Sequence, residues 1–211
     1  MIYEMRTYTT PPGQAPALAK LSSEVGRPIR GDDYGKLEGY WLTEIGPLNQ
    51  VMHLWSFDDL NHRQERRTAL SQNESWTGDY VAQAAPIILK QEIRLLNPIR
   101  PISPPTTEGN IYEYRYYRCK VGKAKAMAEA LNEAMVHREK YSKNVGIWLT
   151  EASQPNEVSH LWAYESLNHR AEARAGAAAD PGWQAMLKAN GPRLEEMSSL
   201  IMVPSSTSPL K

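Results

Sequence analysis

The sequence has little of three features that point to common classes of function: cysteine, net charge and long apolar runs. A single cysteine, Cys119, excludes an internal disulfide and a Cys-x-x-Cys metal site. Lys+Arg and Asp+Glu both number 24, so the net charge is zero. Nucleic acid and anionic membrane surfaces both require a basic excess in their partner, so neither is an expected partner. No apolar run approaches the roughly 18 residues that span a bilayer.

Familiar catalytic and targeting motifs are also missing. The chain has no nucleophile triad and no phosphate-binding glycine loop, and His53 and His62 fall on different predicted elements, which is not a zinc-ligand spacing. The opening "MIYEMRTYTT" has neither a charged-then-apolar signal pattern nor the Arg/Ser-rich character of a transit peptide. We therefore expect no metal site, no cofactor and a cytoplasmic location.

What the chain does contain is a repeat. "NQVMHLWSFDDLNHR" (49–63) returns as "NEVSHLWAYESLNHR" (156–170), with nine of the fifteen positions identical. "IYEMRTY" (2–8) returns as "IYEYRYY" (111–117), and all six tryptophans and four of the five histidines pair across the copies. Self-similarity over this length indicates two tandem copies of one module.

A proline-rich segment marks the boundary between the copies. Residues 98–110 contain four prolines, which restrict the backbone and favour an extended connector. The first repeat is then 1–97 and the second 111–203. Residues 204–211 are expected to form a loose tail.

Hydrophobic periodicity predicts the same elements in each copy. An alternating strand is followed by a helix, two strands joined by a turn, a second helix and a last strand. This β-α-β-β-α-β order is the ferredoxin-like arrangement, which leaves one apolar sheet face uncovered by its helices. We therefore predict an α+β fold in which two four-stranded antiparallel sheets face each other as a pseudo-dimeric α/β barrel. In the first copy the predicted strands are 2–9, 37–44, 50–57 and 92–97.

The motifs "YExRxY" and "HLWxYxSLxHR" resemble those of the NIPSNAP family, within the dimeric α/β-barrel superfamily. The resemblance covers nearly the whole chain, in two copies. It departs from the pattern where Phe57 replaces the phenol that Tyr164 supplies, and where Pro16 interrupts the opening turn of the first helix. The resemblance implies the barrel fold but no established common reaction. Related barrel families include cofactor-free monooxygenases, isomerases and haem-handling enzymes that use the cavity between the sheets.

Successive side chains of a strand point to opposite faces, and this sorts the candidate site residues. The small and aliphatic set suits packing under the helices, so we predict that the polar and aromatic set points into the barrel and lines a ligand cavity. In the first copy this set is Glu4, Arg6, Tyr8, His53, Trp55 and Phe57. In the second copy it is Glu113, Arg115, Tyr117, His160, Trp162 and Tyr164.

Two interpretations of these residues stay open. In the first, the Glu–Arg pairs and the histidines are catalytic, with histidine as a general base or hydrogen-bond donor, and the aromatic residues hold the ligand. In the second, the same groups form a structural network. His62, Arg63, His169 and Arg170 stand at helix starts capped by Asp59 and Ser166, where pairing along the helix, as of Arg63 with Glu65, is expected.

The function predicted from the sequence is binding of a small hydrophobic or aromatic metabolite, with cofactor-free chemistry of a monooxygenase or isomerase type left open. A non-catalytic protein-interaction module is the main alternative. Haem binding through His53 or His160 is a weaker one. The fold is also compatible with a homo-oligomer.

Overall fold

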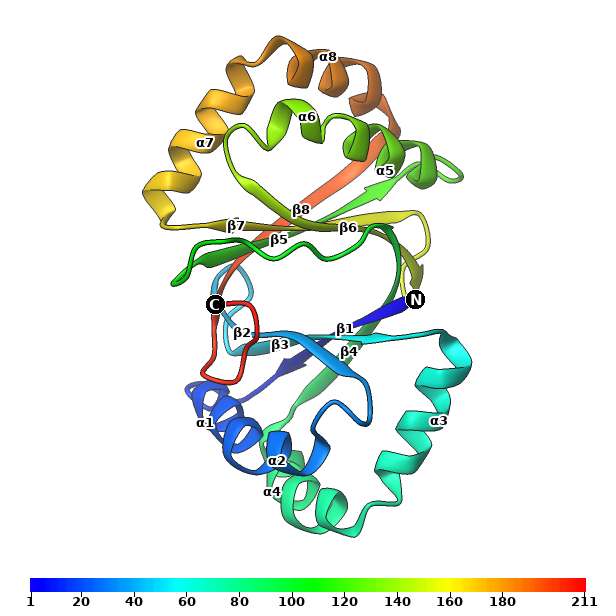
Figure 1. The fold of residues 1–211 in the computed structure, drawn as a ribbon, viewed down its shortest axis with the longest axis vertical. Helices are drawn as coiled ribbons and strands as arrows, with labels where there is room; N and C mark the ends of the chain where they lie inside the picture. The colour runs from blue at the N-terminus through cyan, green and yellow to red at the C-terminus, as the bar shows by residue number, and fades with distance from the viewer. The chain divides into compact units, whose positions relative to one another are not determined.

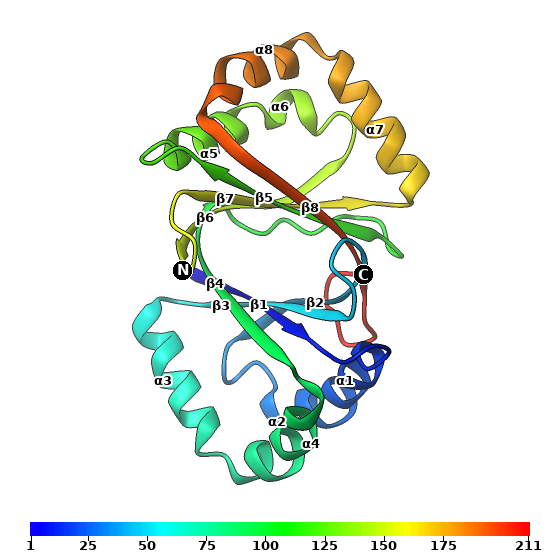
Figure 2. The same cartoon turned by 180° about the vertical axis from the view of Figure 1, so that it is seen from behind.

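The computed structural model describes residues 1–211 and divides into two compact units. Unit 1 comprises residues 1–95 and 203–210, and unit 2 comprises residues 96–202 and Lys211. In each unit the helices lie on one face of its strands, as Figures 1 and 2 show from opposite sides. No helix combines the length and apolar character that crossing a membrane requires.

The two units repeat the predicted order of elements. The first repeat contains β1 (Ile2–Thr9), α1 (Ala15–Leu21), the π-helix η1 (Ser22–Gly26), α2 (Arg27–Arg30), β2 (Lys36–Ile45), β3 (Gln50–Phe57), α3 (Leu60–Ser71), the π-helix η2 (Trp76–Val81), α4 (Ala82–Ala84), the 3-10 helix η3 (Ala85–Ile87) and β4 (Lys90–Arg100). The second contains β5 (Ile111–Cys119), α5 (Ala124–Glu133), α6 (Met135–Arg138), β6 (Lys143–Ala152), β7 (Glu157–Tyr164), α7 (Leu167–Ala179), α8 (Pro181–Asn190), the 3-10 helix η4 (Gly191–Arg193) and β8 (Leu194–Pro204).

The strand order is that of a closed barrel, β1-β3-β2-β8-β5-β7-β6-β4. Within this order, β4-β1-β3-β2 and β8-β5-β7-β6 are each the order of a ferredoxin-like β-α-β-β-α-β unit. The predicted fold class, two such units in a pseudo-dimeric α/β barrel, is confirmed.

The register of the central strands brings the repeated motifs together. In unit 1, β1 and β3 are antiparallel, with Arg6 opposite His53 and Glu4 opposite Trp55. In unit 2, Arg115 lies opposite His160 in the same way. Residues opposite each other in an antiparallel pair share one sheet face, so each unit gathers its Glu, Arg, His and Trp on a single face.

The prediction that this face points away from the helices is wrong. Trp55 and Phe57 pack in one core cluster with Leu18 of α1 and Tyr80 of η2, so their face lies under the helices of unit 1. In unit 2, Trp162 packs with Met127 of α5 in the same way. The opposite face is buried as well, so hydrophobic alternation separates the two faces without telling which one the helices cover.

The repeated string begins with an asparagine for a local reason. Asn49 and Asn156 both have positive φ, 57° and 61°, a conformation that asparagine tolerates better than most residues. The Oδ1 atom of each accepts a hydrogen bond from a backbone N–H of the loop after the first strand, from Gly13 at 3.1 Å and Gly122 at 2.8 Å. These bonds fix the start of β3 and of β7, the strands that carry His53 and His160.

Two local expectations differ from the structure. Pro16 does not interrupt the first helix, because α1 begins at Ala15 and proline is compatible with the first helical turn. The C-terminal segment predicted to be a loose tail is held in place: Ser205 N–H donates to the Tyr40 carbonyl, and Tyr40 N–H donates to Ser208 Oγ. Leu210 is buried in the same segment.

Candidate functional site

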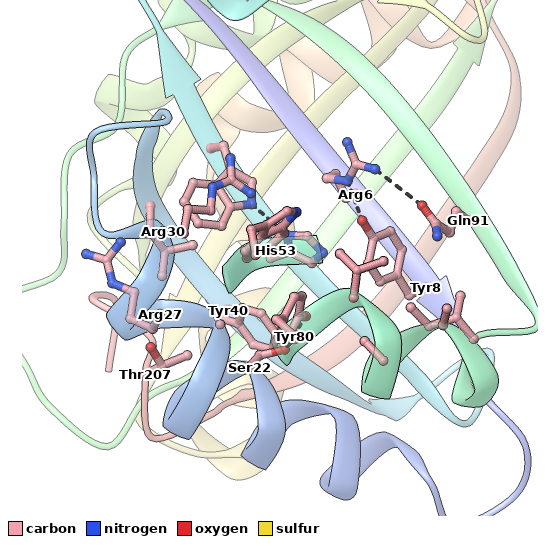
Figure 3. A pocket seen from close by; sticks show the side chains of 18 of the residues that line it. Arg6, Tyr8, Ser22, Arg27, Arg30, Tyr40, His53, Tyr80, Gln91 and Thr207 are labelled. Carbon is pink, nitrogen blue, oxygen red and sulfur yellow. Dashed lines mark hydrogen bonds between the residues drawn. The ribbon is translucent and has the colours of Figure 1, made fainter. Parts of the chain in front are cut away.

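A cavity of about 230 Å³ lies in unit 1, lined by residues of the sheet and of its helices. That volume falls just below the roughly 300 Å³ at which typical small-molecule sites begin, so it fits a small ligand. Its floor is the β1 and β3 face that carries Arg6, Tyr8, His53 and Trp55. Figure 3 shows His53 and Tyr40 side by side at its centre. The helices add Ser22, Arg30, Arg67, Trp76 and Tyr80.

A buried ion cluster supports the floor. Arg6 Nη1 donates to Glu4 Oε1 at 2.7 Å, and Arg63 of α3 donates to Glu4 Oε2. Burial alone raises the pKa of Glu4, but Arg6 and Arg63 outweigh burial and hold that pKa below its ordinary value. Arg6 also donates to the Tyr8 hydroxyl at 2.7 Å and to Gln91 Oε1 at 3.3 Å. Glu4 is therefore an ionised anchor for two arginines and does not itself line the cavity.

His53 is held as one neutral tautomer. Trp55 Nε1 donates to His53 Nδ1 at 2.6 Å. Indole Nε1 is a donor and never an acceptor, so Nδ1 carries no proton and the neutral ring holds its proton on Nε2. Burial, followed by the charges of Arg6 and Arg30, lowers the pKa of His53 well below 6.5, so the ring stays neutral near pH 7.

The Nε2–H of His53 has no hydrogen-bond partner within the protein, although the atom is buried. His53 stacks on Tyr40 with ring centroids 5.1 Å apart and meets Tyr8 edge-on at 4.8 Å. These contacts fix the ring on the cavity floor. A buried donor without an acceptor is costly, about 1–3 kcal/mol, which makes this atom a candidate ligand contact.

Arg30 is a second buried cation at the cavity. Its guanidinium lies over the Trp55 ring, 3.3 Å from the centroid, and donates to the Tyr34 carbonyl at 3.0 Å. Its Nε has no partner. Burial and the repulsion of Arg67 and Arg6 lower the pKa of Arg30 to about 9. Its positive charge is thus poorly compensated by the protein.

Three hydroxyl groups meet on the helix side of the cavity. Tyr40 donates to Ser22 Oγ at 2.7 Å, and Ser22 Oγ lies 2.8 Å from the Tyr80 hydroxyl. Three hydroxyl protons and two mutual hydrogen bonds leave one donor for another partner. Ser22 and Tyr80 each belong to a π-helix, a local distortion frequent at functional sites.

Unit 2 repeats the ion cluster with more partners. Glu113 accepts hydrogen bonds from Arg115 at 3.1 Å, Arg170 at 2.7 Å, Tyr164 at 3.1 Å and Ser199 at 2.5 Å. Burial raises the pKa of Glu113, but its hydrogen bond with Arg170 and the charge of Arg115 outweigh burial and lower that pKa to about 2. Phe57 stands where Tyr164 does, so Glu4 has no corresponding phenol partner.

The histidine arrangement is also repeated. Trp162 Nε1 donates to His160 Nδ1 at 2.5 Å, and His160 Nε2 is buried without a partner. Burial, then the charge of Arg115, lowers the pKa of His160 well below 6.5. The unit 2 cavity, about 210 Å³, is lined by Arg115, Tyr117, Arg138, His160, Trp162 and Tyr164 with a large share of methionine, leucine and alanine.

The residues at the helix starts have structural contacts. Asp59 accepts from His62 N–H and Ser166 accepts from His169 N–H, which confirms both as N-caps. The predicted pairing of Arg63 along its own helix is wrong, because its partner is Glu4 on β1. Arg170 pairs with Glu113 in the same way, at 2.7 Å. The basic residues of the repeated string therefore bind the repeated carboxylate of the first strand.

Several cavity residues were missed by the sequence reasoning, chiefly Arg30, Arg67 and the hydroxyl group of Ser22, Tyr40 and Tyr80. One signal was available: Arg67 and Arg174 repeat one helical turn after Arg63 and Arg170. Arginines four residues apart share a helix face, so Arg67 and Arg174 could have been predicted on the face of Arg63 and Arg170. The three hydroxyl residues occur in one copy alone and leave no such signal.

Neither cysteine nor metal chemistry finds support. Burial raises the pKa of Cys119 to about 11, which keeps the thiol protonated and unreactive. No group of three or more His, Cys, Asp or Glu side chains comes together in a way that could hold a metal ion.

Comparisons with known proteins place the chain in a family. The family model described as NIPSNAP matches residues 3–104 and again residues 112–209. Protein NipSnap homolog 3A of Homo sapiens is 31% identical over 217 residues, covering 100% of this chain and 86% of that protein. Protein NipSnap homolog of Dictyostelium discoideum is 30% identical, covering 96% of this chain and 87% of that protein.

The fold also occurs in solved structures of low sequence identity. An anthrone oxidase-like protein is 10% identical and superimposes with a TM-score of 0.69 over 100% of this chain and 94% of its own. The likeness extends over both units and concerns the fold alone. The family model matches the two repeats separately, which agrees with the duplication found in the sequence, and the chain belongs to the NIPSNAP family.

Proposed function

We propose that the protein binds a small organic molecule with a flat apolar body in the unit 1 cavity, between the sheet and the helices. The space between the two sheets, where the sequence led us to expect the ligand, is not part of this proposal. The single observation that carries it is that His53, a residue of the cavity wall, has a buried Nε2–H without an acceptor within the protein. Trp55, Trp76 and Tyr80 supply aromatic surface for the ligand body.

The tautomer of His53 decides what chemistry this site would support. Because Nε2 already carries the proton, His53 donates a hydrogen bond and does not act as a general base at the cavity. A neutral imidazole donor in a dry site stabilises an oxygen on which negative charge develops. An oxygenase or isomerase whose reaction passes through an enolate or phenolate would use such a donor. In its catalytic form, the proposal is that the protein is an enzyme of this kind.

Haem does not fit the same residues. Axial ligation requires a free lone pair on the imidazole nitrogen that faces the iron. In His53 and His160 that nitrogen is protonated, and moving the proton to Nδ1 would set it against the indole N–H of Trp55 or Trp162. We therefore do not propose haem binding.

Isothermal titration with two flat bicyclic probes, 2-naphthol and 2-naphthoate, tests the binding proposal. Ala85 is an exposed residue of the unit 1 cavity wall, and Ala178 holds a comparable place at the unit 2 cavity. Ala85→Trp should narrow the cavity and weaken probe binding about tenfold or more, equal to about 1.4 kcal/mol. Ala178→Trp is the matched control and should leave the unit 1 affinity unchanged. Failure of both probes to bind the wild-type protein contradicts the proposal.

A further inference from the structure

The walls of the unit 1 cavity carry positive charge without an anion to match it. Arg6, Arg27, Arg30 and Arg67 line the cavity, and no aspartate or glutamate does. Arg27 is paired with Asp32 at 2.8 Å. The nearby Glu4 carboxylate is shared by Arg6 and Arg63. Arg30 and Arg67 therefore remain as charges that form no ion pair with a carboxylate of the protein.

Neither Arg30 nor its unit 2 counterpart, Arg138, has a carboxylate partner, but Arg30 has fewer side-chain hydrogen bonds. Arg138 lies over Trp162 as Arg30 lies over Trp55, with distances to the ring centroid of 4.5 Å and 3.3 Å. Arg138 donates to Ser142 Oγ at 2.7 Å and to the Tyr164 hydroxyl at 3.4 Å. In unit 1 the phenylalanine at position 57 offers no hydroxyl, and Arg30 is left with the Tyr34 carbonyl and an unpartnered Nε.

Two residues that line the cavity, His53 and Arg30, therefore each carry a buried donor without an acceptor, Nε2–H and Nε–H. The Trp55 side chain joins them, since its ring lies under Arg30 and its N–H bonds to His53. A charged donor in a dry site gains most from a charged acceptor, because charge-assisted hydrogen bonds are roughly twice as strong as neutral ones.

We infer that the ligand of the unit 1 cavity is an organic oxyanion, a carboxylate or phenolate on a flat apolar body, whose oxygen accepts from His53 Nε2–H and from Arg30. This inference rests on the proposed function and adds the chemical class of the ligand. The apolar body contacts Trp76 and Tyr80, and Arg67 adds a further positive charge at the wall. Buried charge is compensated on binding, so the anion contributes selectivity as well as affinity.

The two naphthalene probes separate this inference from the proposed function, because they have nearly the same shape and differ in charge at pH 7. Wild-type protein should bind 2-naphthoate at least about tenfold more tightly than 2-naphthol, equal to about 1.4 kcal/mol. Equal affinities would overturn the oxyanion assignment while leaving the binding proposal intact. Failure of both probes to bind would overturn both.

Two pairs of variants locate the selectivity. Arg30→Met keeps an apolar side chain over Trp55 and should remove most of the preference for 2-naphthoate, while Arg138→Met, its unit 2 counterpart, should preserve it. Arg67 is half-buried, so Arg67→Gln leaves the core intact and should lower 2-naphthoate affinity severalfold with little effect on 2-naphthol. Arg174→Gln is its matched control. A preference for 2-naphthoate that persists in both Arg30→Met and Arg67→Gln would overturn the inference. If one of these variants fails to fold, the other variant decides the question.

Discussion

The two units share the same order of helices and strands and the same ion cluster, and they differ in the residues that line their cavities. Both have the carboxylate of the first strand bound to an arginine of the helix that follows the third strand, as Glu4 to Arg63 and Glu113 to Arg170. Both hold a histidine through a tryptophan N–H. Features present in both units, the unpartnered histidine Nε2 among them, do not distinguish one cavity from the other. The features that distinguish unit 1 are therefore the better guide to what the protein binds.

The differences are coordinated with one another. Gly26 of unit 1 leaves room for the Tyr80 ring, since a Cβ atom at Gly26 would lie 2.8 Å from it. At the offset of 109 that relates the first strands and Gly13 to Gly122, Met135 occupies the place of Gly26. At the offset of 107 that relates Trp76 to Trp183, Leu187 occupies the place of Tyr80. A larger residue in the place of Gly26 therefore accompanies the loss of the Tyr80 ring.

The largest expected effect concerns the cluster of glutamate and arginine side chains that both units share. Glu4→Gln and Glu113→Gln each leave two buried or half-buried arginines without their carboxylate, and should lower the free energy of unfolding by about 3–5 kcal/mol. The effect should be at least as large for Glu113, which has four hydrogen-bond partners from four side chains. Thermal and urea unfolding of both variants measure it. A loss below about 1 kcal/mol in either unit would refute a common structural role for the cluster.

The coordinated difference between the units is tested by a double-mutant cycle. Gly26→Ala alone should cost about 1–3 kcal/mol of unfolding free energy, because the added methyl group meets the Tyr80 ring. In a Tyr80→Leu background the same substitution should cost nearly nothing. Gly78→Ala, in the other π-helix, meets no atom within 4 Å and serves as control. Additive effects of the two substitutions would refute the coupling.

The shared histidines predict a pH dependence of stability. His53 and His160 have pKa values well below 6.5 when folded, whereas the unfolded chain titrates near 6.5. Below pH 6.5 the unfolded state therefore binds more protons, and stability present above that pH is lost as the pH falls. The slope from each histidine should rise from about 0.7 kcal/mol per pH unit at pH 6.5 toward about 1.4 as the pH falls below that value.

Glutamine variants sharpen this measurement. His53→Gln and His160→Gln retain a donor and an acceptor without titrating, so each should flatten the slope by a similar amount. The carboxylates of Glu4 and Glu113, with lowered pKa values, act in the same direction but at pH values below about 4.5, outside this window. A slope that is unchanged in the double variant would show that neither ring is kept neutral by the fold.

The smallest expected effect tests whether the corresponding helices of the two units, α3 and α7, have the same structural role. Asp59→Ala and Ser166→Ala each remove an N-cap from the helix that follows the third strand of the unit, α3 or α7. Each should cost about 1 kcal/mol of unfolding free energy. Thermal unfolding of the two variants should give similar losses. A large loss at one cap alone would mean that the capped helices do not have the same role.

Much of the fold could be predicted from the sequence, because duplication doubles every signal. The strand pattern "IYEMRTY", the three tryptophans and the helix-capping position of the first copy all recur in the second copy at consistent offsets, the cap as Asp59 and Ser166. The elements and their order followed from those repeats. The NIPSNAP resemblance rested on the same residues, and the family match confirms it.

The orientation of the candidate site could not be predicted in the same way. Both faces of β1 are buried, with Tyr3 and Met5 on one and Glu4 and Arg6 on the other. Alternation therefore could not say which face the helices cover. The helices cover the charged face because Arg63 and Arg170 reach back to it, a contact that joins residues 59 and 57 positions apart. Sequence spacing carries no information on such pairs.

The cavity itself was the least predictable part. Ser22, Tyr40 and Tyr80 come from three elements and occur in one copy only, and Arg30 stands at the end of a short helix. Their meeting depends on two π-helices, which have no simple sequence pattern. The sequence alone left open whether His53 or His160 contacts a ligand. The Trp–His hydrogen bonds narrow that hypothesis to a donor role for Nε2.

The most direct test of the central claim is a crystal structure with 6-bromo-2-naphthoate, in which anomalous scattering from bromine locates the ligand. We predict a bromine peak in the unit 1 cavity, with the carboxylate within hydrogen-bond distance of His53 Nε2, and a weaker peak or none in unit 2. Bromine outside the unit 1 cavity, or a carboxylate turned away from His53 and Arg30, would contradict the account.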